Sequence, residues 1–281
     1  MICEWDSLLL ILPQWMRADV DKLGKKTLTE LRLRVNAPPE LRLLDARLLL
    51  NRKIQASDLI FIINAATRYS PWIAETASKG YITAPGGHRI GICGKANTSS
   101  AYMLSASGIG SLCIRIARDF PGLAETAPNT GSVLIIGSPG TGKTTLLRDL
   151  IRQRSRKSGQ AIAVVDEREE LFPRVNGAFC FPSCEYIDVL SGCNKERGIE
   201  NVLRTMGPDV IAIDEITAAQ DCETLLNACW CGVSLLATAH AGSKKEFLQR
   251  KIYKPIVECG IFERLIILRK DMSWYMEEIG A

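Results

Sequence analysis

A glycine-rich segment offers the most specific chemistry in this chain of 281 residues. Residues 137–144 read GSPGTGKT and fit the pattern GxxxxGK[ST] in full. A run of valine and isoleucine precedes them, and leucines at helical spacing follow from Leu146. Glycines let backbone N–H groups curl around phosphate oxygens, and a helix that starts there directs its electropositive end at the anion. The segment predicts a phosphate-binding loop between a strand and a helix.

Two side chains of this loop have predicted roles at a nucleoside triphosphate. Lys143 can reach the β- and γ-phosphates, and the hydroxyl group of Thr144 can ligate Mg²⁺. The expected ligands are therefore ATP and Mg²⁺. The residues predicted to bind the nucleotide are Gly137, Ser138, Pro139, Gly140, Thr141, Gly142, Lys143, Thr144 and Thr145.

Paired carboxylates follow a second apolar run, at residues 210–213. Asp214 suits the Mg²⁺ site, directly or through water. Glu215 is placed to polarise an attacking water, because a second carboxylate is what general-base chemistry needs. The pair favours hydrolysis of the nucleotide over binding alone.

Two further strand ends carry polar residues that could join the site. Residues 166–170 read DEREE, from which Glu167 is predicted to help hold Mg²⁺ and Glu170 to act in catalysis. A solvated charged turn is the alternative interpretation. His240 ends another apolar run and could sense the γ-phosphate by hydrogen bonding, or could be a turn histidine without a role.

The elements that must position these residues differ between the two halves of the chain. Residues 1–118 mix helical and alternating strand patterns, which predicts a small α+β domain. Residues 119–131 carry prolines and glycines and are the predicted linker. Residues 132–281 contain short continuous apolar runs separated by helical patterns, which is typical of a mainly parallel sheet buried on both faces. The predicted fold is α/β, with ligands bound beyond the carboxyl ends of the strands.

Composition excludes several classes of protein. With 47% hydrophobic and 23% charged residues, the chain is neither disordered nor a coiled coil. No apolar run approaches the roughly 18–20 residues that cross a bilayer, and we expect a cytoplasmic protein without a membrane span. The net charge of +4 is too mild to argue for nucleic acid. The 10 cysteines form no CxxC pair, so buried thiols are a more economical interpretation than a disulfide framework or a zinc site.

The order and spacing of these motifs resemble the secretion-superfamily ATPases, the ring motors of type II and type IV secretion and of pilus assembly. Residues 137–144 match their Walker A motif, and residues 208–215 look like their Walker B segment with Glu215 in the catalytic position. Residues 166–170 resemble their acidic box, with Glu170 at its last carboxylate, and residues 237–240 resemble their histidine box. This chain lacks the paired CxxC zinc module of some type II motors, and it has Asp214 where many secretion motors have glycine.

Within that superfamily, the chain is more similar to the stage III sporulation AA family of endospore-forming bacteria. Residues 30–34, 86–94 and 114–118, with the GSPG form of the phosphate loop, carry this resemblance. It implies a RecA-like P-loop ATPase core behind a smaller N-terminal domain. It also implies a homo-hexamer in the mother-cell cytoplasm, peripheral to the membrane, that energises membrane-embedded channel proteins of the same operon.

A ring would also supply arginines in trans to the γ-phosphate. Arg89, Arg115 and Arg118 precede the linker, where such motors often place them, although each is also an ordinary candidate for a surface arginine. Three other functions stay open: a helicase-like ATPase acting on nucleic acid, a small-molecule kinase, and a switch in which ATP drives assembly with little turnover.

Overall fold

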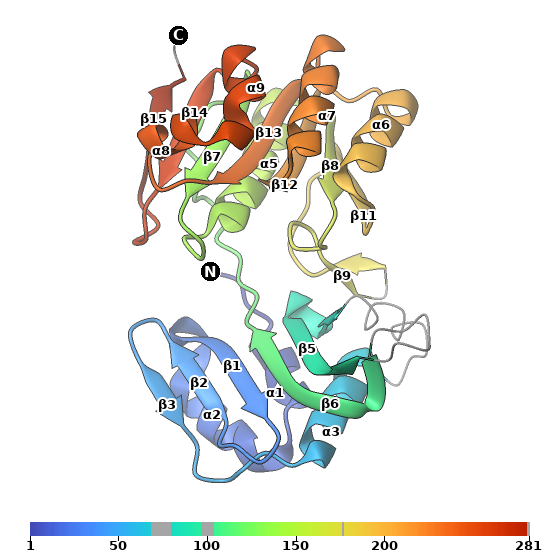
Figure 1. Cartoon of the computed structure of the whole chain (residues 1–281), viewed down its shortest axis with the longest axis vertical. Helices are drawn as coiled ribbons and strands as arrows, with labels where there is room; N and C mark the ends of the chain where they lie inside the picture. Colours follow the sequence, from blue (N-terminus) through green and yellow to red (C-terminus); the bar gives the residue numbers. More distant parts are fainter. Residues whose placement is uncertain (69–79, 97–103, 176, 280–281) are drawn as a thin grey trace. The chain divides into compact units, whose positions relative to one another are not determined.

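The computed structural model describes residues 1–68, 80–96, 104–175 and 177–279, and it divides into two compact units (Figure 1). The first unit comprises Met1–Asp119 together with Pro173–Cys180, and the second comprises Phe120–Phe172 and Phe181–Ala281. The segment Pro173–Cys180 thus packs with the first unit although it lies between strands of the second in the sequence. Nothing in its composition distinguishes it from its neighbours.

The first unit is an antiparallel sheet with helices against one face (Figure 1). Its strands lie in the order β3-β2-β1-β6-β5-β4. Leucines and isoleucines alternate along them and are buried under the helices, as the period of two requires. The elements are α1 (Trp5–Ile11), α2 (Gln14–Thr27), β1 (Leu28–Arg34), β2 (Glu40–Leu43), β3 (Arg47–Leu49), α3 (Ala56–Thr67), β4 (Tyr81–Thr83), the 3₁₀ turn η2 (Pro85–Gly87), β5 (Arg89–Ala96), β6 (Leu104–Arg115), β9 (Arg174–Val175) and β10 (Ala178–Phe179).

A buried histidine joins three segments of the first unit. His88 has no exposed surface, and its Nδ1 accepts a hydrogen bond from the backbone N–H of Ala117 at 3.1 Å. Its Nε2 lies 3.0 Å from the carbonyl oxygen of Glu4 and therefore carries the proton. Burial lowers the pKa of His88, which keeps this neutral tautomer in place.

The second unit is built on a sheet of order β11-β8-β12-β13-β7-β14-β15. Every neighbouring pair is parallel except β14 and β15. Its central strands are buried along their length, which confirms the interpretation of the continuous apolar runs. The elements are β7 (Val133–Gly137), α5 (Lys143–Ser158), β8 (Ile162–Asp166), β11 (Ile187–Ser191), α6 (Lys195–Thr205), β12 (Val210–Ile216), α7 (Ala219–Trp230), β13 (Ser234–His240), α8 (Lys244–Gln249), η3 (Lys251–Tyr253), α9 (Lys254–Glu258), β14 (Arg264–Leu268) and β15 (Trp274–Glu278).

The segment predicted as a linker is held by hydrogen bonds at several points. Asp119 pairs with Ile2 in an isolated bridge of the first unit. Beyond it, side chains of α5 and β14 bind the backbone of residues 124–131. Asp149 accepts from the N–H of Ala124, and Lys157, Arg264 and Arg154 donate to the carbonyl oxygens of Glu125, Thr130 and Gly131, respectively. Among the described residues, no helix is long and apolar enough to cross a membrane.

Candidate nucleotide site

Parallel pairing brings the predicted site residues to one edge of the second sheet. Strand β13 lies between β12 and β7, and His240 at its end is in register with Gly137 at the end of β7. Strand β12 ends beside them with Asp214 and Glu215. The carboxyl ends of these three strands therefore meet the phosphate loop, as ligand sites of open parallel sheets do.

A β-bulge turns both carboxylates of β12 toward the same site. In a regular strand, adjacent side chains point to opposite faces. Here the register shifts between Ile213 and Ile216, which oppose Ala237 and Ala239, so three residue steps on β12 face two on β13. Glu215 has φ of 59°, a left-handed conformation that is uncommon outside glycine. Its backbone N–H donates to Thr238 Oγ1 at 2.8 Å, which fixes the bulge.

Asp214 is held between two hydroxyl groups. Thr144 Oγ1 donates to Asp214 Oδ2 at 2.7 Å, and Thr238 Oγ1 donates to Asp214 Oδ1 at 2.6 Å. This arrangement puts the first hydroxyl group of helix α5 against a carboxylate at the end of β12. Hydroxyl and carboxylate oxygens are ligands that Mg²⁺ prefers, with water and phosphate oxygens completing its shell.

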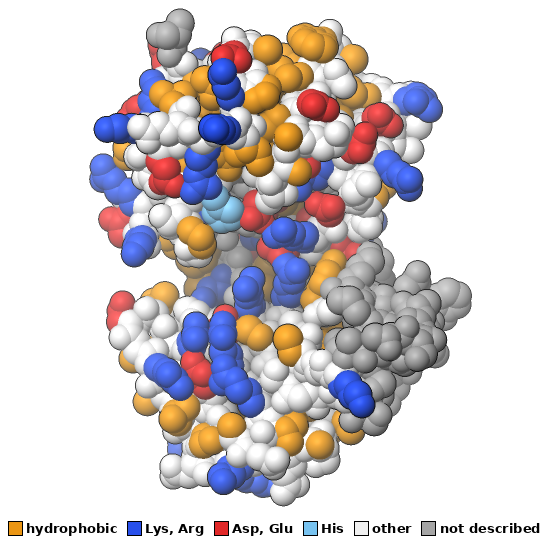
Figure 2. Space-filling model, viewed as in Figure 1, with side chains coloured by type: hydrophobic (Ala, Val, Ile, Leu, Met, Phe, Trp, Pro, Cys, Tyr) orange, Lys and Arg blue, Asp and Glu red, His pale blue; other side chains and the backbone are white. Residues whose placement is uncertain are grey.

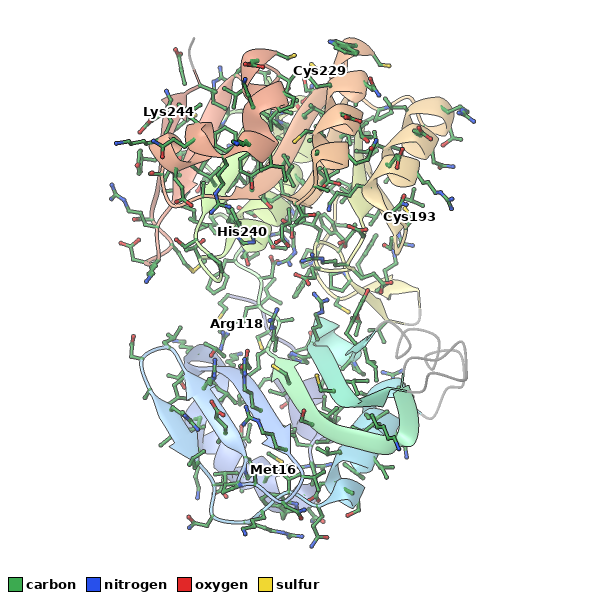
Figure 3. All side chains as sticks on the ribbon, in the orientation of Figure 1. Met16, Arg118, Cys193, Cys229, His240 and Lys244 are labelled. Atoms are coloured by element: carbon green, nitrogen blue, oxygen red, sulfur yellow. The ribbon has the colours of Figure 1, made fainter. Side chains whose placement is uncertain are left out.

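Lys143, His240 and Glu215 form a chain of hydrogen bonds across the site. Lys143 is 7% exposed, and its Nζ donates to the carbonyl oxygens of Gly137 and Ser138 at 3.0 and 3.1 Å. The same Nζ lies 2.9 Å from His240 Nδ1, and His240 Nε2 lies 2.7 Å from Glu215 Oε1. Since the ammonium group only donates, His240 accepts at Nδ1 and donates from Nε2 to the carboxylate. Figure 3 labels His240 at this edge of the sheet.

Two opposite effects act on the pKa of Lys143 in this hydrogen-bonded site. Burial lowers the pKa of Lys143, while the nearby carboxylates of Asp214 and Glu215 raise it. Arg168, from the turn after β8, pairs with the other oxygen of Glu215. Glu215 is thus bound by a histidine on one oxygen and an arginine on the other, which fixes its position.

The acidic end of β8 has a different structure. Asp166 is 1% exposed and accepts three backbone N–H groups, from Glu170 at 2.9 Å, Leu171 at 3.0 Å and Phe172 at 2.9 Å. Burial raises its pKa to about 6, against the effect of these hydrogen bonds. The Asp166 carboxylate closes the turn that follows the strand.

Two residues predicted for the site from this segment have other contacts. Glu167 pairs with the buried Lys195 at 3.1 Å, and Lys195 also contacts Asp221 at 3.4 Å. Glu170 contributes its N–H to Asp166, and its carbonyl oxygen accepts from Arg148. The structure brings Lys143, Thr144, Asp214, Glu215 and His240 together, and it pairs Glu167 with Lys195.

The three predicted trans arginines belong to the first unit. Arg89 lies over the ring of Tyr81 at 4.4 Å, and Arg115 is 3.9 Å from a Glu30 oxygen. Arg118, labelled in Figure 3, donates from Nε to the carbonyl oxygen of Lys25 at 2.9 Å and also to that of Leu28. Each has a contact within its own unit.

The phosphate loop has the shape that a triphosphate with Mg²⁺ requires. Gly140 and Gly142 have φ of 76° and 98°, conformations that let successive N–H groups converge without side-chain strain. A Cβ atom on Gly137 would lie 2.7 Å from Thr141 Oγ1, so the first glycine is also required by close packing. Lys143 supplies a positive charge for the phosphates, and Thr144 and Asp214 supply oxygen ligands for Mg²⁺. These residues therefore fit a nucleoside triphosphate with Mg²⁺.

Two contributors to the site have a position in the sequence motifs but no predicted role. Thr238 is the first residue of the Thr-x-His sequence, and its hydroxyl group links the carboxylate of Asp214 to the backbone of Glu215. Arg168 stands inside the acidic segment, and its guanidinium reaches Glu215 across 47 residues of sequence. The sequence shows both residue types, but only the fold shows that Thr238 and Arg168 meet at the Asp214–Glu215 pair.

Ten cysteines are free thiols in the structure. Within the described ranges, no group of three or more His, Cys, Asp or Glu side chains could hold a metal ion by itself. This is compatible with a Mg²⁺ site of the phosphate-loop kind, in which the protein supplies few ligands.

Residues 10–274 match the family described as "Sporulation stage III, protein AA". The chain belongs to this family. Its sequence is 34% identical to "Stage III sporulation protein AA" of Bacillus subtilis (strain 168), over 92% of this chain and 89% of that protein. The resemblance to the sporulation AA family is therefore confirmed.

Solved structures share the fold of this sporulation AA family member. The Legionella pneumophila ATPase DotB superposes with a TM-score of 0.58 at 16% identity, over 94% of this chain and 79% of that one. The pilus retraction motor PilT with bound ADP gives 0.61 at 14% identity, over 96% and 78%. The predicted fold class, a P-loop α/β core with a mainly parallel sheet behind a smaller α+β domain, is confirmed.

Proposed function

We propose that this protein binds ATP with Mg²⁺ and hydrolyses it. The observation that carries the proposal is the convergence of Lys143, Thr144, Asp214, Glu215 and His240 at one strand edge, through hydrogen bonds of 2.7 to 2.9 Å. The phosphate loop supplies the contacts for the phosphates. The bulge supplies two carboxylates, Asp214 for Mg²⁺ and Glu215 for the attacking water. The fold shared with the ATPase DotB and with PilT, whose structure contains bound ADP, supports the same activity.

Each side chain has a proposed task. Lys143 and the loop N–H groups bind the phosphates, while Thr144 and Asp214 hold Mg²⁺, which neutralises charge that develops on the phosphate oxygens. Glu215 accepts a proton from the attacking water, which requires its carboxylate to lie within hydrogen-bond reach of that water. His240 links Lys143 to Glu215 by hydrogen bonds. A γ-phosphate bound at Lys143 can therefore change the position of the general base through His240. Glu170 and Glu167 stay predictions for catalysis and for Mg²⁺, respectively.

We also propose a ring of identical subunits, a homo-hexamer, acting on a membrane-embedded channel complex in the mother cell during spore formation. The support is the family, the likeness of fold to the pilus retraction motor PilT and the resemblance of the site motifs to those of ring motors. In a ring, one subunit can offer an arginine to the neighbour's γ-phosphate, for which Arg89, Arg115 and Arg118 are the candidates. Light scattering against nucleotide and protein concentration tests this part separately from hydrolysis.

The test of the activity is Mg²⁺-dependent release of phosphate from ATP by the full chain. We expect turnover that EDTA abolishes and that Lys143→Ala removes together with ATP binding. Lys251→Ala is the matched control, because Lys251 is an exposed lysine of the same unit outside the site. Specific activity that rises with concentration, together with a nucleotide-favoured oligomer, would support shared sites. Wild-type protein that neither binds nor hydrolyses ATP would contradict the proposal.

A further inference from the structure

The outer face of the first unit's sheet carries arginines in a row across the strands. Pairing places Arg47 of β3 opposite Arg42 of β2, Arg42 opposite Glu30, Glu30 opposite Arg115, and Arg115 opposite Arg89. Neighbouring strands lie about 4.8 Å apart, so the row runs roughly 19 Å along the sheet. Figure 2 shows Lys and Arg side chains gathered over this unit, with acidic side chains among them.

This row is costly for the fold alone. Two of its cross-strand pairs, Arg42–Arg47 and Arg115–Arg89, set like charges directly opposite one another, which destabilises a sheet. Two pairs of like charges opposite one another on the same face of a sheet indicate that these arginines serve a function other than stabilising the fold. An anionic partner would remove the repulsion.

Two carboxylates hold these arginines in place rather than neutralise them. Glu40 is 3% exposed and pairs with Arg34 at 2.9 Å, Arg42 at 3.0 Å and Arg47 at 3.3 Å. Glu30 does the same for another group, made up of Arg32, Arg42 and Arg115. Five arginines thus share two carboxylates, which leaves an excess of three positive charges.

The guanidinium groups held by Glu40 remain partly exposed. Arg42 and Arg47 contact Glu40 through Nε, at 3.0 and 3.3 Å. Arg47 and Arg34 are 63% and 45% exposed at the side chain. A planar guanidinium with free terminal N–H groups matches the oxygens of a phosphate in a bidentate fashion.

Exposed leucines lie at the same edge of the sheet. The β2–β3 turn carries Leu44, which is 68% exposed, and β3 carries Leu48 and Leu49 at 43% and 54%. The Arg42–Arg47 pair is the last one before this turn. The turn at the tip therefore carries one exposed leucine, with the Arg42–Arg47 pair directly behind it, and Leu48 and Leu49 follow farther along the edge strand. Asp45, in the tip, opposes deep burial in hydrocarbon and limits the tip to headgroup depth.

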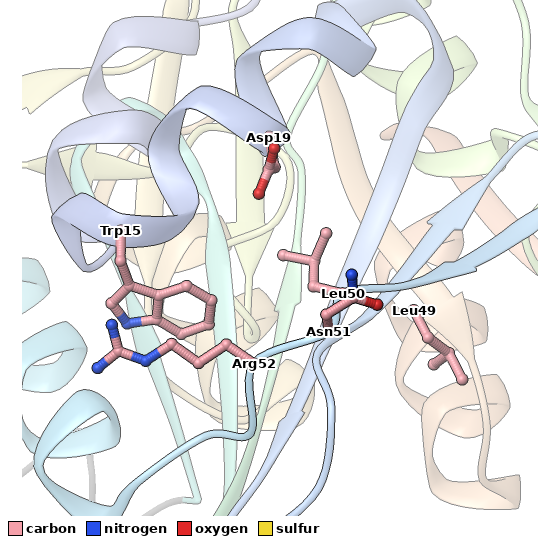
Figure 4. A pocket seen from close by; sticks show the side chains of 6 residues that line it. All are labelled: Trp15, Asp19, Leu49, Leu50, Asn51 and Arg52. Carbon is pink, nitrogen blue, oxygen red and sulfur yellow. The ribbon is translucent and has the colours of Figure 1, made fainter.

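A hollow of about 400 Å³ continues this edge (Figure 4). It is lined by Trp15, Asp19, Leu49, Leu50, Asn51 and Arg52. The guanidinium of Arg52 lies 4.6 Å from the ring centre of Trp15, and Trp15 Nε1 donates to Asp58 at 3.1 Å. Tryptophan beside arginine and leucine is the composition of membrane–water interfaces.

We propose that the β2–β3 hairpin and the arginine-bearing face beside it bind the surface of an anionic phospholipid bilayer. Arg34, Arg42 and Arg47 contact lipid phosphates, and Leu44 and Leu49 lie among the headgroups. Arg89 and Arg115 stay candidates for the neighbouring subunit's nucleotide and are not needed for this contact. A nucleic acid fits less well, because Tyr81 is the one aromatic residue along the described strands of this sheet and it is covered by Arg89. The proposal does not depend on the nucleotide site.

The test is co-sedimentation of the full chain, without nucleotide, with phosphatidylcholine vesicles that do or do not contain phosphatidylglycerol. We expect binding only to the anionic vesicles, weakened by salt. The double variant Arg34→Gln/Arg47→Gln should weaken it roughly tenfold or more, since each basic residue near the surface contributes to the attraction. Glu40 keeps its bond to Arg42 in this variant, so the sheet should remain folded, as circular dichroism would verify.

Two controls separate lipid binding from other causes. Lys245→Gln/Lys251→Gln removes the same charge from exposed positions of the second unit and should leave binding unchanged. Leu44→Ser, at a largely exposed site, should leave a weaker binding that salt abolishes more easily. Equal loss in both double variants, equal binding to neutral vesicles, or preference for a DNA oligonucleotide that displaces the vesicles would overturn the proposal.

Discussion

Strands β8 and β12 of the second unit both end in carboxylates, yet the two ends are built for different tasks. At β8, Asp166 is buried and its oxygens are occupied by backbone N–H groups of the following turn. At β12, Asp214 and Glu215 bind side chains of three other segments. The same sequence pattern, an apolar strand followed by acids, gives a structural cap in one place and, in our proposal, the Mg²⁺ ligand and the base in the other.

The difference originates in one irregularity of the backbone. Strand β8 keeps its register with β12 up to Val165, whereas β12 shifts against β13 after Ile213. The shift puts Glu215 in a left-handed conformation and directs two consecutive carboxylates to one site. A regular strand would have offered only one of them.

The largest expected effect compares one carboxylate from each strand end. Asp214→Ala should lower Mg²⁺-dependent hydrolysis by about 100-fold or more, because it removes the oxygen partner of Thr144 at the metal position. Glu167→Ala should change the rate by less than about threefold, because Glu167 pairs with Lys195. Steady-state phosphate release against Mg²⁺ concentration measures both. A larger loss in the Glu167 variant would contradict this expectation and would support the prediction that Glu167 helps to hold Mg²⁺.

For the stability of the second unit, the carboxylate at the end of β8 should matter more than its role in hydrolysis suggests. Asp166→Ala leaves three backbone N–H groups near Phe172 without their acceptor, and we expect a loss of about 3 kcal/mol in the free energy of unfolding of the second unit. The exposed Asp188 of β11 is the matched control, and Asp188→Ala should stay within about 0.5 kcal/mol of wild type. Urea titration measures both. Equal stability of the two variants would show that the Asp166 carboxylate is not the cap described above.

The bulge itself can be weakened at Thr238. Thr238→Val removes the hydroxyl group that joins Asp214 to the Glu215 backbone, so we expect hydrolysis to fall roughly tenfold with a stability loss of about 1 to 2 kcal/mol. Thr238→Ser keeps the hydroxyl group and should recover most of the rate. Identical rates in the valine and serine variants would mean that the bulge does not depend on this bond.

The smallest expected effect is a difference in pH dependence between the two units. Asp166 has a pKa of about 6 when folded and about 4 when unfolded, so the second unit should lose stability as pH rises from 4 to 6. His88 has a folded pKa below its ordinary value of about 6.5, so the first unit should lose stability as pH falls below 6.5.

Hydrogen exchange followed by mass spectrometry can read peptides of β8 and of β1 separately across this range. Asp166→Asn should flatten the response of the β8 peptides and leave the β1 peptides unchanged. Parallel pH responses of the two sets in wild type would contradict the assignment of opposite slopes to the two units.

Much of this arrangement was predictable from the sequence, and the remainder depends on tertiary contacts. The phosphate loop and the buried strands could be predicted, because glycine spacing and continuous apolar runs are local signals. The pairing of Arg168 with Glu215 and of Glu167 with Lys195 could not, since each joins residues far apart in the sequence. The bulge also escaped prediction, because nothing in the residues around Asp214 differs from a regular strand end.

We propose that the bulge makes Glu215 the base for hydrolysis, while the loop alone accounts for nucleotide binding. The most direct test is single-turnover hydrolysis of ATP by wild type and Glu215→Gln, at matched nucleotide occupancy measured by equilibrium binding. Glu200→Gln, at an exposed position of α6, controls for the loss of a carboxylate. We predict equal binding in all three and a rate at least about 100-fold lower in Glu215→Gln alone. Equal rates in wild type and Glu215→Gln would show that Glu215 is not the base.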